Sequence, residues 1–88
     1  MTNAIDILLV GGARNGTVVC MNRARMSTNI EIPGEAEQIT YVRKVWTDPD
    51  TTLQYHVATQ PGEGEPGDAD IANEIALARF PAAWDLNR

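Results

Sequence analysis

The glycine-rich stretch LLVGGARNGTVV, residues 8–19, contains the residue types that could grip a phosphate. Gly11 and Gly16 have the separation of the two glycines in the phosphate-binding loop G-x-x-x-x-G-K-[ST]. Thr17 occupies the lysine position, and the β-branched run TVVCM follows where that loop would open a helix. Asn15-Gly16 between two apolar runs is typical of a hairpin turn, because both residues tolerate the positive φ of a type I′ turn. The stretch therefore predicts a structural turn at Asn15 and Gly16.

Cys20 and His56 are the residues that could supply a nucleophile and a base. Cys20 is the single cysteine and lies in the strand-like run TVVCMN, a setting typical of a small buried thiol. A catalytic cysteine would need a base, and His56 is the single histidine. Because the predicted strand register places no carboxylate beside His56, we interpret it as a surface residue without a chemical role. The sequence predicts that the protein is not an enzyme.

The chain offers few metal ligands. Structural zinc requires four close Cys or His ligands, and the chain has two such residues in total. Asp48 and Asp50 resemble the opening of a calcium-binding EF-hand loop, but Leu53 stands where the loop glycine belongs. We therefore predict neither a metal nor a cofactor.

Length and charge restrict the class of protein. The 88 residues suit one domain spanning 1–88, and so small a core favours homo-oligomerisation. Residues 1–44 carry five basic and four acidic side chains, whereas residues 45–88 carry two basic and eight acidic ones. The net charge of −5 disfavours nucleic-acid binding, and the acidic half either engages a basic partner surface or maintains solubility. No apolar run is long enough for a membrane span, and the first residues carry Asp6 instead of the basic segment of a signal peptide, so we expect a cytoplasmic protein.

Hydrophobic periodicity predicts strands over 4–10, 17–21 and 30–32, then a longer hairpin over 38–60 that turns at Asp48-Pro49-Asp50. The stretch PGEGEPG, residues 61–67, reads as an acidic linker. A helix begins at a capping Asp68 and ends at Phe80, because Pro81 forbids its continuation. The expected fold is α+β, an antiparallel sheet of four or five strands with one C-terminal helix packed on it.

Placing Trp46 opposite Thr52 sorts the residues of the hairpin by face. One face is apolar, apart from an Arg43 that lies over the ring of Tyr55. Its apolar members are Ile39, Tyr41, Val45, Leu53, Tyr55 and Val57. The other face is predicted to be solvent-exposed, and it carries Thr40, Val42, Lys44, Trp46, Thr52, Gln54, His56 and Ala58.

Three large hydrophobic residues are predicted to be poorly covered. Trp46 lies on the exposed hairpin face, Leu77 lies in the polar sector of the helix, and Trp84 lies in the short tail. Exposed tryptophan is typical of protein interfaces, so these residues are candidate partner contacts, together with Lys44 and His56 on the face of Trp46. The alternative left open is that the tail and the linker cover them within the fold.

The order of three segments resembles a group of small actinobacteriophage accessory proteins of the mycobacteriophage type. The segments are DILLVGGARNGTVV, QITYVRKVWTDPDTTLQYHVATQ and DADIANEIALARF. Members of the group commonly open with an aliphatic strand and a Gly-Gly-x-x-x-Gly turn, continue to a Tyr-x-Arg-rich strand and end in a helix. Asn15 stands where many members have Asp, a change that the turn tolerates. The group has no established catalytic residues, so the resemblance implies no active site.

The resemblance implies an accessory protein that acts in the cytoplasm of an infected bacterium. It would bind a host or phage protein and modulate it, with harm to the host as one outcome. The alternative is a small phage structural or assembly component that acts through homo-oligomerisation. An acidic mimic of DNA is a third interpretation, but the regular row of carboxylates that such a mimic needs is missing.

Overall fold

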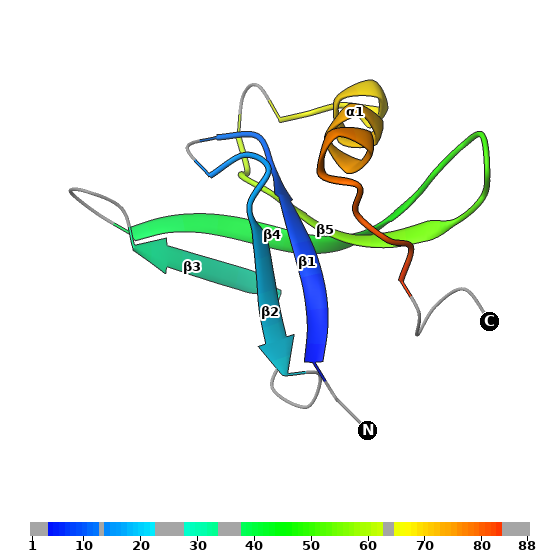
Figure 1. Cartoon of the computed structure of the whole chain (residues 1–88). Helices are drawn as coiled ribbons and strands as arrows, with labels where there is room; N and C mark the ends of the chain where they lie inside the picture. The colour runs from blue at the N-terminus through cyan, green and yellow to red at the C-terminus, as the bar shows by residue number, and fades with distance from the viewer. Residues whose placement is uncertain (1–3, 13, 23–27, 34–37, 63–64, 84–88) are drawn as a thin grey trace.

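The fold consists of one curled sheet and one helix (Figure 1). The computed structural model describes residues 4–12, 14–22, 28–33, 38–62 and 65–83. The strands are β1 (Ala4–Val10), β2 (Val18–Asn22), β3 (Asn29–Pro33), β4 (Gln38–Thr47) and β5 (Gln54–Thr59), and the helix is α1 (Asp68–Ala78). The predicted α+β arrangement of strands with one C-terminal helix is confirmed.

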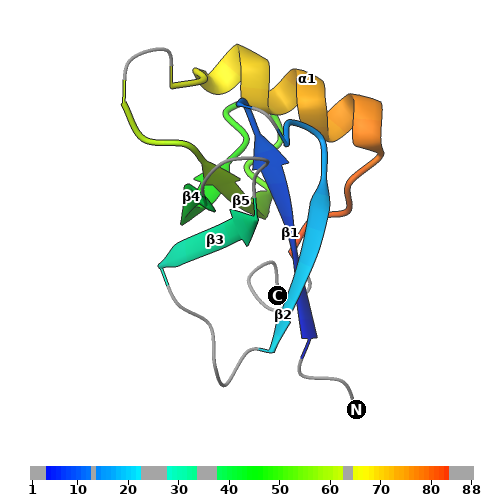
Figure 2. The same ribbon diagram turned by 90° about the vertical axis from the view of Figure 1, so that its left-hand side faces the viewer.

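The sheet is mixed, and the prediction of a purely antiparallel sheet is wrong in this respect. The strand order is β2-β1-β5-β4-β3, and β1 runs parallel to β5 over three residue pairs, from Leu8↔Val57 to Val10↔Thr59. The other pairs are antiparallel. The two antiparallel units therefore meet along a short parallel contact, and the sheet curls there. Figure 2 shows the consequence, because both edge strands, β2 and β3, face the viewer on the same side of the molecule.

β1 is covered on both faces. Alternate side chains of a strand point to opposite faces of its sheet, and Ile7, Leu8, Leu9 and Val10 are all buried. The cluster beneath the helix contains Leu8, Val10, Trp46, Tyr55, Val57, Ile71, Ile75 and Phe80. The cluster inside the curl contains Ile5, Ile7, Leu9, Ile30, Tyr41 and Ala58. The continuous apolar run in the sequence thus reflects a strand between two cores.

The register of the β4–β5 hairpin differs from the predicted one. Trp46 lies opposite Tyr55 instead of Thr52, a shift of three residues. The turn at Asp48 is confirmed, with the Asp48 N–H donating to the Leu53 carbonyl at 2.9 Å. However, Thr52 adopts a left-handed φ of 62°, and the loop is longer than the prediction allowed. Because side chains alternate with a period of two, an odd shift regroups them, so that the even-numbered residues of β4 share a face with the odd-numbered residues of β5.

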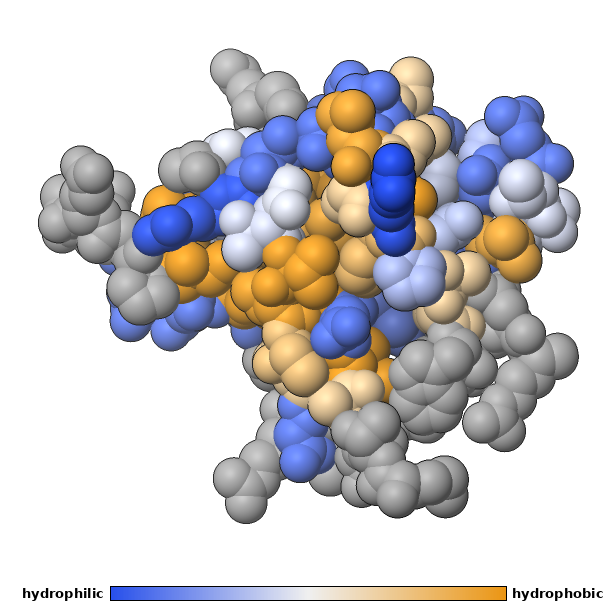
Figure 3. Space-filling view, in the orientation of Figure 1, coloured by the Kyte–Doolittle hydropathy of each residue, from blue (hydrophilic) through white to orange (hydrophobic). Residues whose placement is uncertain are grey.

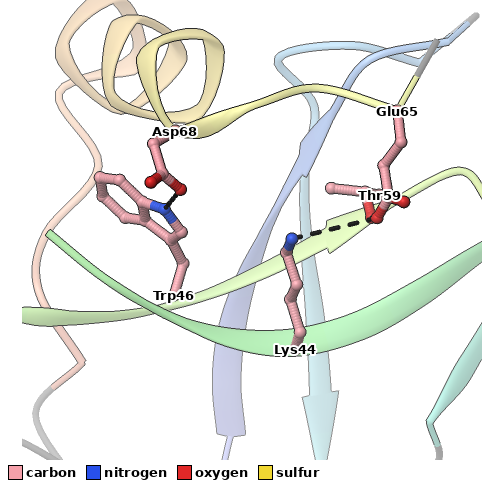
Figure 4. A network of polar contacts seen from close by, with 5 residues as sticks. All are labelled: Lys44, Trp46, Thr59, Glu65 and Asp68. Atoms are coloured by element: carbon pink, nitrogen blue, oxygen red, sulfur yellow. Dashed lines mark hydrogen bonds and ion pairs between the residues drawn. The ribbon is translucent and has the colours of Figure 1, made fainter.

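Both faces of the hairpin are covered, so residues that we expected in solvent are buried. Trp46 is 5% exposed and His56 is 6% exposed. The Trp46 ring centroid lies 5.9 Å from that of Tyr55, and its indole N–H donates to a carboxylate oxygen of Asp68 at 2.9 Å (Figure 4). Arg43 lies opposite Ala58, so the predicted contact with the Tyr55 ring is wrong. Conversely, Val45 and Leu53 are exposed at 43% and 39% instead of forming an apolar face.

The helix forms where the sequence predicts it, but its cap differs. Gly67 is the N-cap and makes no side-chain hydrogen bond, so the predicted capping role of Asp68 is wrong. Asp68 instead accepts the Trp46 indole N–H, while its charge still favours the N-terminal end of the helix dipole. The helix ends at Ala78, with a left-handed Arg79 as its C-cap, two residues before the predicted end at Phe80. Leu77 is 70% exposed, as predicted.

The bond between Trp46 and Asp68 should stabilise the docked helix measurably. We expect Asp68→Ala to lower the free energy of unfolding by about 1–2 kcal/mol, because the half-buried indole N–H loses its acceptor. Asp68→Asn keeps an acceptor and should lose less. Urea unfolding followed by tryptophan fluorescence measures both, with Asp70→Ala as the control that removes the same charge from the first turn. Equal losses for Asp68→Ala and Asp70→Ala would contradict a specific role for the indole bond.

Candidate functional site

The glycine-rich loop is a hairpin turn with a bulge. The Gly16 N–H donates to the Leu9 carbonyl at 2.8 Å, and the Leu9 N–H donates to the Thr17 carbonyl at 2.8 Å. Two residues of one strand therefore oppose one residue of the other, which defines a β-bulge. Gly16 has the predicted positive φ, 85°, but Asn15 is not among the positive-φ residues, so the turn is not type I′. The loop is longer than a two-residue turn, and its positive φ angles lie at Gly11, Gly12 and Gly16, because glycine adopts them readily.

Hydrogen bonds from distant elements hold this loop in place. The Tyr41 hydroxyl donates to the Gly11 carbonyl at 2.7 Å and accepts the Arg14 N–H at 3.0 Å. Asn15 accepts the Gly11 N–H at 2.6 Å and donates to a carboxylate oxygen of Glu74 at 3.0 Å. Most of the main-chain N–H groups described in this loop therefore donate within the fold and do not face an anion. The adjoining hollow of about 340 Å³ is bordered by the Asp70 and Glu74 carboxylates, which repel anions.

Removing the Tyr41 hydroxyl should loosen the loop. We expect Tyr41→Phe to lower the free energy of unfolding by about 1–3 kcal/mol, because one buried hydroxyl satisfies two main-chain groups. Tyr55→Phe is the matched control, since Tyr55 is a buried tyrosine whose described contact is the tilted ring of Trp46. Chemical denaturation measures the difference. A loss for Tyr55→Phe as large as that for Tyr41→Phe would contradict the assigned role.

The candidate partner contacts do not gather on one surface. Trp46 and His56 are buried, so their predicted exposure is wrong. His56 lines a pocket of about 70 Å³ with residues 80–83, far below the roughly 300–1,000 Å³ of ligand sites. Lys44 has a 40% exposed side chain whose ammonium lies 4.0 Å from Glu65, a residue of the predicted linker 61–67 (Figure 4). Leu77 lies exposed on the helix, and Trp84 lies outside the described residues.

The curl of the sheet creates a groove between its two edge strands. The opening has a volume of about 670 Å³. Among the described residues, the lining includes Val19, Cys20 and Met21 from β2 and Asn29, Ile30, Glu31 and Ile32 from β3. Figure 3, which views the molecule as in Figure 1, shows hydrophobic side chains gathered in the middle of that side, with polar side chains around them. The groove is an apolar surface that the described part of the chain leaves uncovered.

Main-chain groups of both edges point away from their neighbouring strands. Hydrogen-bonded and non-hydrogen-bonded pairs alternate along an antiparallel ladder. The bond between Leu9 and Thr17 therefore leaves the main-chain groups of Cys20 directed outward from β2. By the same alternation, the bond from the Arg43 N–H to the Thr28 carbonyl leaves those of Glu31 directed outward from β3. The groove thus combines apolar side chains with main-chain donors and acceptors along its rims.

Cys20 lies at the rim of the groove and is exposed, so the prediction of a buried thiol is wrong. The helix covers part of β1 but not the outer face of β2, on which Cys20 lies opposite Asp6. The pKa of the Cys20 thiol is raised by partial desolvation, and further by a hydrogen bond to Asp6 and by the negative charge of that residue. A raised thiol pKa disfavours the reactive thiolate at neutral pH, so this position is unsuited to nucleophilic catalysis.

The raised pKa predicts slow alkylation of Cys20. Because less thiolate is present at neutral pH, iodoacetamide should react more slowly with the folded protein than with the same protein in urea. Asp6→Asn should accelerate the reaction of the folded protein severalfold, since removal of the negative charge lowers the thiol pKa. Mass spectrometry against time at several pH values measures both rates. No change on Asp6→Asn would contradict the electrostatic cause.

Sequence reasoning missed the groove residues. The alternation of Val19 and Met21 with exposed neighbours in β2, and of Ile30 and Ile32 in β3, was visible as a pattern of half-buried strands. That pattern did not reveal that the two strands face each other, because three other strands separate them in the sheet.

Comparisons with known proteins identify no relative from which a function could be inferred. The chain matches no protein-family model, no curated protein and no solved structure significantly. Within residues 4–83, apart from the short undescribed segments, no three His, Cys, Asp or Glu side chains are grouped as metal ligands. The described helix is too short to span a membrane.

Proposed function

We propose that this protein is a binding module that holds an extended segment of a partner protein in the groove between β2 and β3. The observation that supports this function is the pairing of an apolar floor with two sheet edges that have no further neighbour among the described strands. Recognition by addition of a strand uses main-chain hydrogen bonds for affinity and alternate side chains for specificity. The groove offers both.

The directions of the edge strands define how a segment fits. Following the pairings around the sheet, β2 and β3 run in opposite directions. A single inserted strand is therefore antiparallel to one edge and parallel to the other, and it closes the curled sheet. A strand that belongs to a sheet of the partner would not fit, because the strand beside it would collide with the other edge of the groove. The occupant is thus a linear segment or a tail.

The biological setting of this proposal comes from the resemblance to actinobacteriophage accessory proteins. The partner is a host or phage protein in the cytoplasm of the infected bacterium, and its activity changes when the segment is held. Burial of Trp46 and His56 moves the proposed contact surface from the β4–β5 hairpin to the groove. Leu77 remains a candidate for a separate contact on the helix.

Homo-oligomerisation is the second candidate function, and one observation favours it. β2 has the sequence VVCMN, without a charged residue or a proline, and Val18 is 46% exposed. Edge strands of this kind pair readily with other chains unless charges or prolines protect them. An assembly component would self-associate at micromolar concentration in analytical ultracentrifugation, whereas a module for a linear segment would stay monomeric.

Two adjacent valines of β2 provide the test of groove binding. Val19 lines the groove and Val18 points to the opposite face. We expect Val19→Asp to abolish capture of the partner from infected-cell lysate, because a carboxylate in the apolar floor is costly to bury. Val18→Asp places the same charge one residue away and should retain the partner. If circular dichroism shows that Val19→Asp is unfolded, the isosteric variant Val19→Thr replaces it in the experiment. Equal capture by folded Val19 and Val18 variants would contradict the proposal.

A further inference from the structure

We infer that the segment held in the groove is basic, with apolar residues facing the groove and Lys or Arg on its outer face, and that it pairs antiparallel with β2. This inference rests on the proposed function and specifies the chemistry of its partner. It follows from the charges at the two rims and from the difference between the two edge strands.

The two edges differ in how well they accept a strand. β3 ends in Pro33, which has no N–H to donate, and Glu31 places a carboxylate on the rim. β2 contains neither a proline nor a charged residue. Charges and prolines are the usual means by which edge strands resist pairing. β2 is therefore the edge that receives the segment, and antiparallel pairing is the slightly more stable mode.

The charges near the groove select the outer side chains of the segment. In antiparallel pairing, the residue of the segment opposite Cys20 has its side chain on the same face as Cys20 and Asp6. Its Cα lies two strand spacings, roughly 10 Å, from that of Asp6. A Lys or Arg side chain can reach across the small Cys20 to the carboxylate. Glu31 lies at the opposite rim, so the segment runs between two carboxylates.

The floor of the groove selects the inner side chains. Val19 and Met21 from β2 are half-buried, as is Ile32 from β3, whereas Ile30 is buried. The β-branched and aliphatic floor favours β-branched residues at every second position of the segment. An alternating apolar and basic sequence meets both requirements.

Arg23 and Arg25 carry positive charges that would disfavour a basic segment, so they provide the alternative that the test must distinguish. They lie in the connection between β2 and β3, outside the described residues. If these arginines governed the groove, an acidic segment would bind in preference to a basic one. Whether the groove prefers a basic or an acidic segment therefore shows which charges select it, the rim carboxylates or the arginines of the connection.

The test uses two capped synthetic peptides, one alternating valine with lysine and the other alternating valine with glutamate. Two ion pairs at exposed positions contribute up to about 1 kcal/mol each, so we expect the lysine peptide to bind about tenfold more tightly at low salt. The preference should shrink as salt screens the rim charges. Asp6→Asn and Glu31→Gln should each reduce it severalfold, whereas Asp70→Asn on the helix should leave it unchanged. Fluorescence anisotropy of labelled peptides measures the affinities.

N-methylation of the lysine peptide identifies the receiving edge. In antiparallel pairing with β2, the N–H groups of the outward-facing lysines donate to β2, whereas those of the valines point toward β3. Methylation of the lysine main-chain nitrogens should therefore abolish binding, while methylation of the valine nitrogens should weaken it less. The reverse order, or binding unaffected by either change, would overturn pairing with β2.

The outcomes separate this inference from the proposed function. Equal or tighter binding of the glutamate peptide overturns the inference that the segment is basic. The charges that select the segment would then be those of Arg23 and Arg25. Failure of both peptides to bind also overturns the inference, but the groove keeps its function if Val19→Asp still abolishes partner capture while Val18→Asp does not. A stable dimer that the lysine peptide does not dissociate assigns the β2 edge to a second copy of the chain and overturns the inference.

Discussion

The need to cover both faces of β1 governs the rest of the structure. Its apolar run points Leu8 and Val10 toward the helix and Ile7 and Leu9 toward the opposite side. One helix covers one face of a strand, and in the described part of the chain the other face has only the sheet itself to cover it. The short parallel contact between β1 and β5 lets the sheet curl over that second face. The second core is therefore built from strands alone.

The sheet curls without closing, so its two edge strands, β2 and β3, approach each other but do not pair. The groove between them leaves one side of the second core without a further strand to cover it. In a chain of 88 residues the buried area is small and the net stability is correspondingly modest. Covering the open side with a bound segment adds apolar burial and main-chain hydrogen bonds at once. In the proposed function, binding of a segment would therefore also stabilise the fold.

Polar contacts attach the remaining elements to the sheet. The Trp46 indole holds the start of the helix through Asp68, and Glu65 joins the segment before the helix to the sheet through Thr59 and Lys44 (Figure 4). Tryptophan commonly anchors protein interfaces, but here it anchors an interface within the chain. The groove of the proposed function lies on the opposite side of the sheet, away from these polar contacts.

Local features were determined by the sequence alone. The turns at Gly16 and Pro49, the helix with its stop before Pro81 and the exposure of Leu77 depend on residues close together in the chain, whose conformational preferences act locally. Only the tertiary structure decided the hairpin register, because turn length is set by hydrogen bonds around the left-handed Thr52. The resulting shift of three residues changed which side chains of β4 and β5 share a face. The tertiary structure likewise decided the parallel pairing of β1 with β5 and the groove between β2 and β3. Both join segments far apart in the chain, and their formation depends on which surfaces bury the most apolar area together.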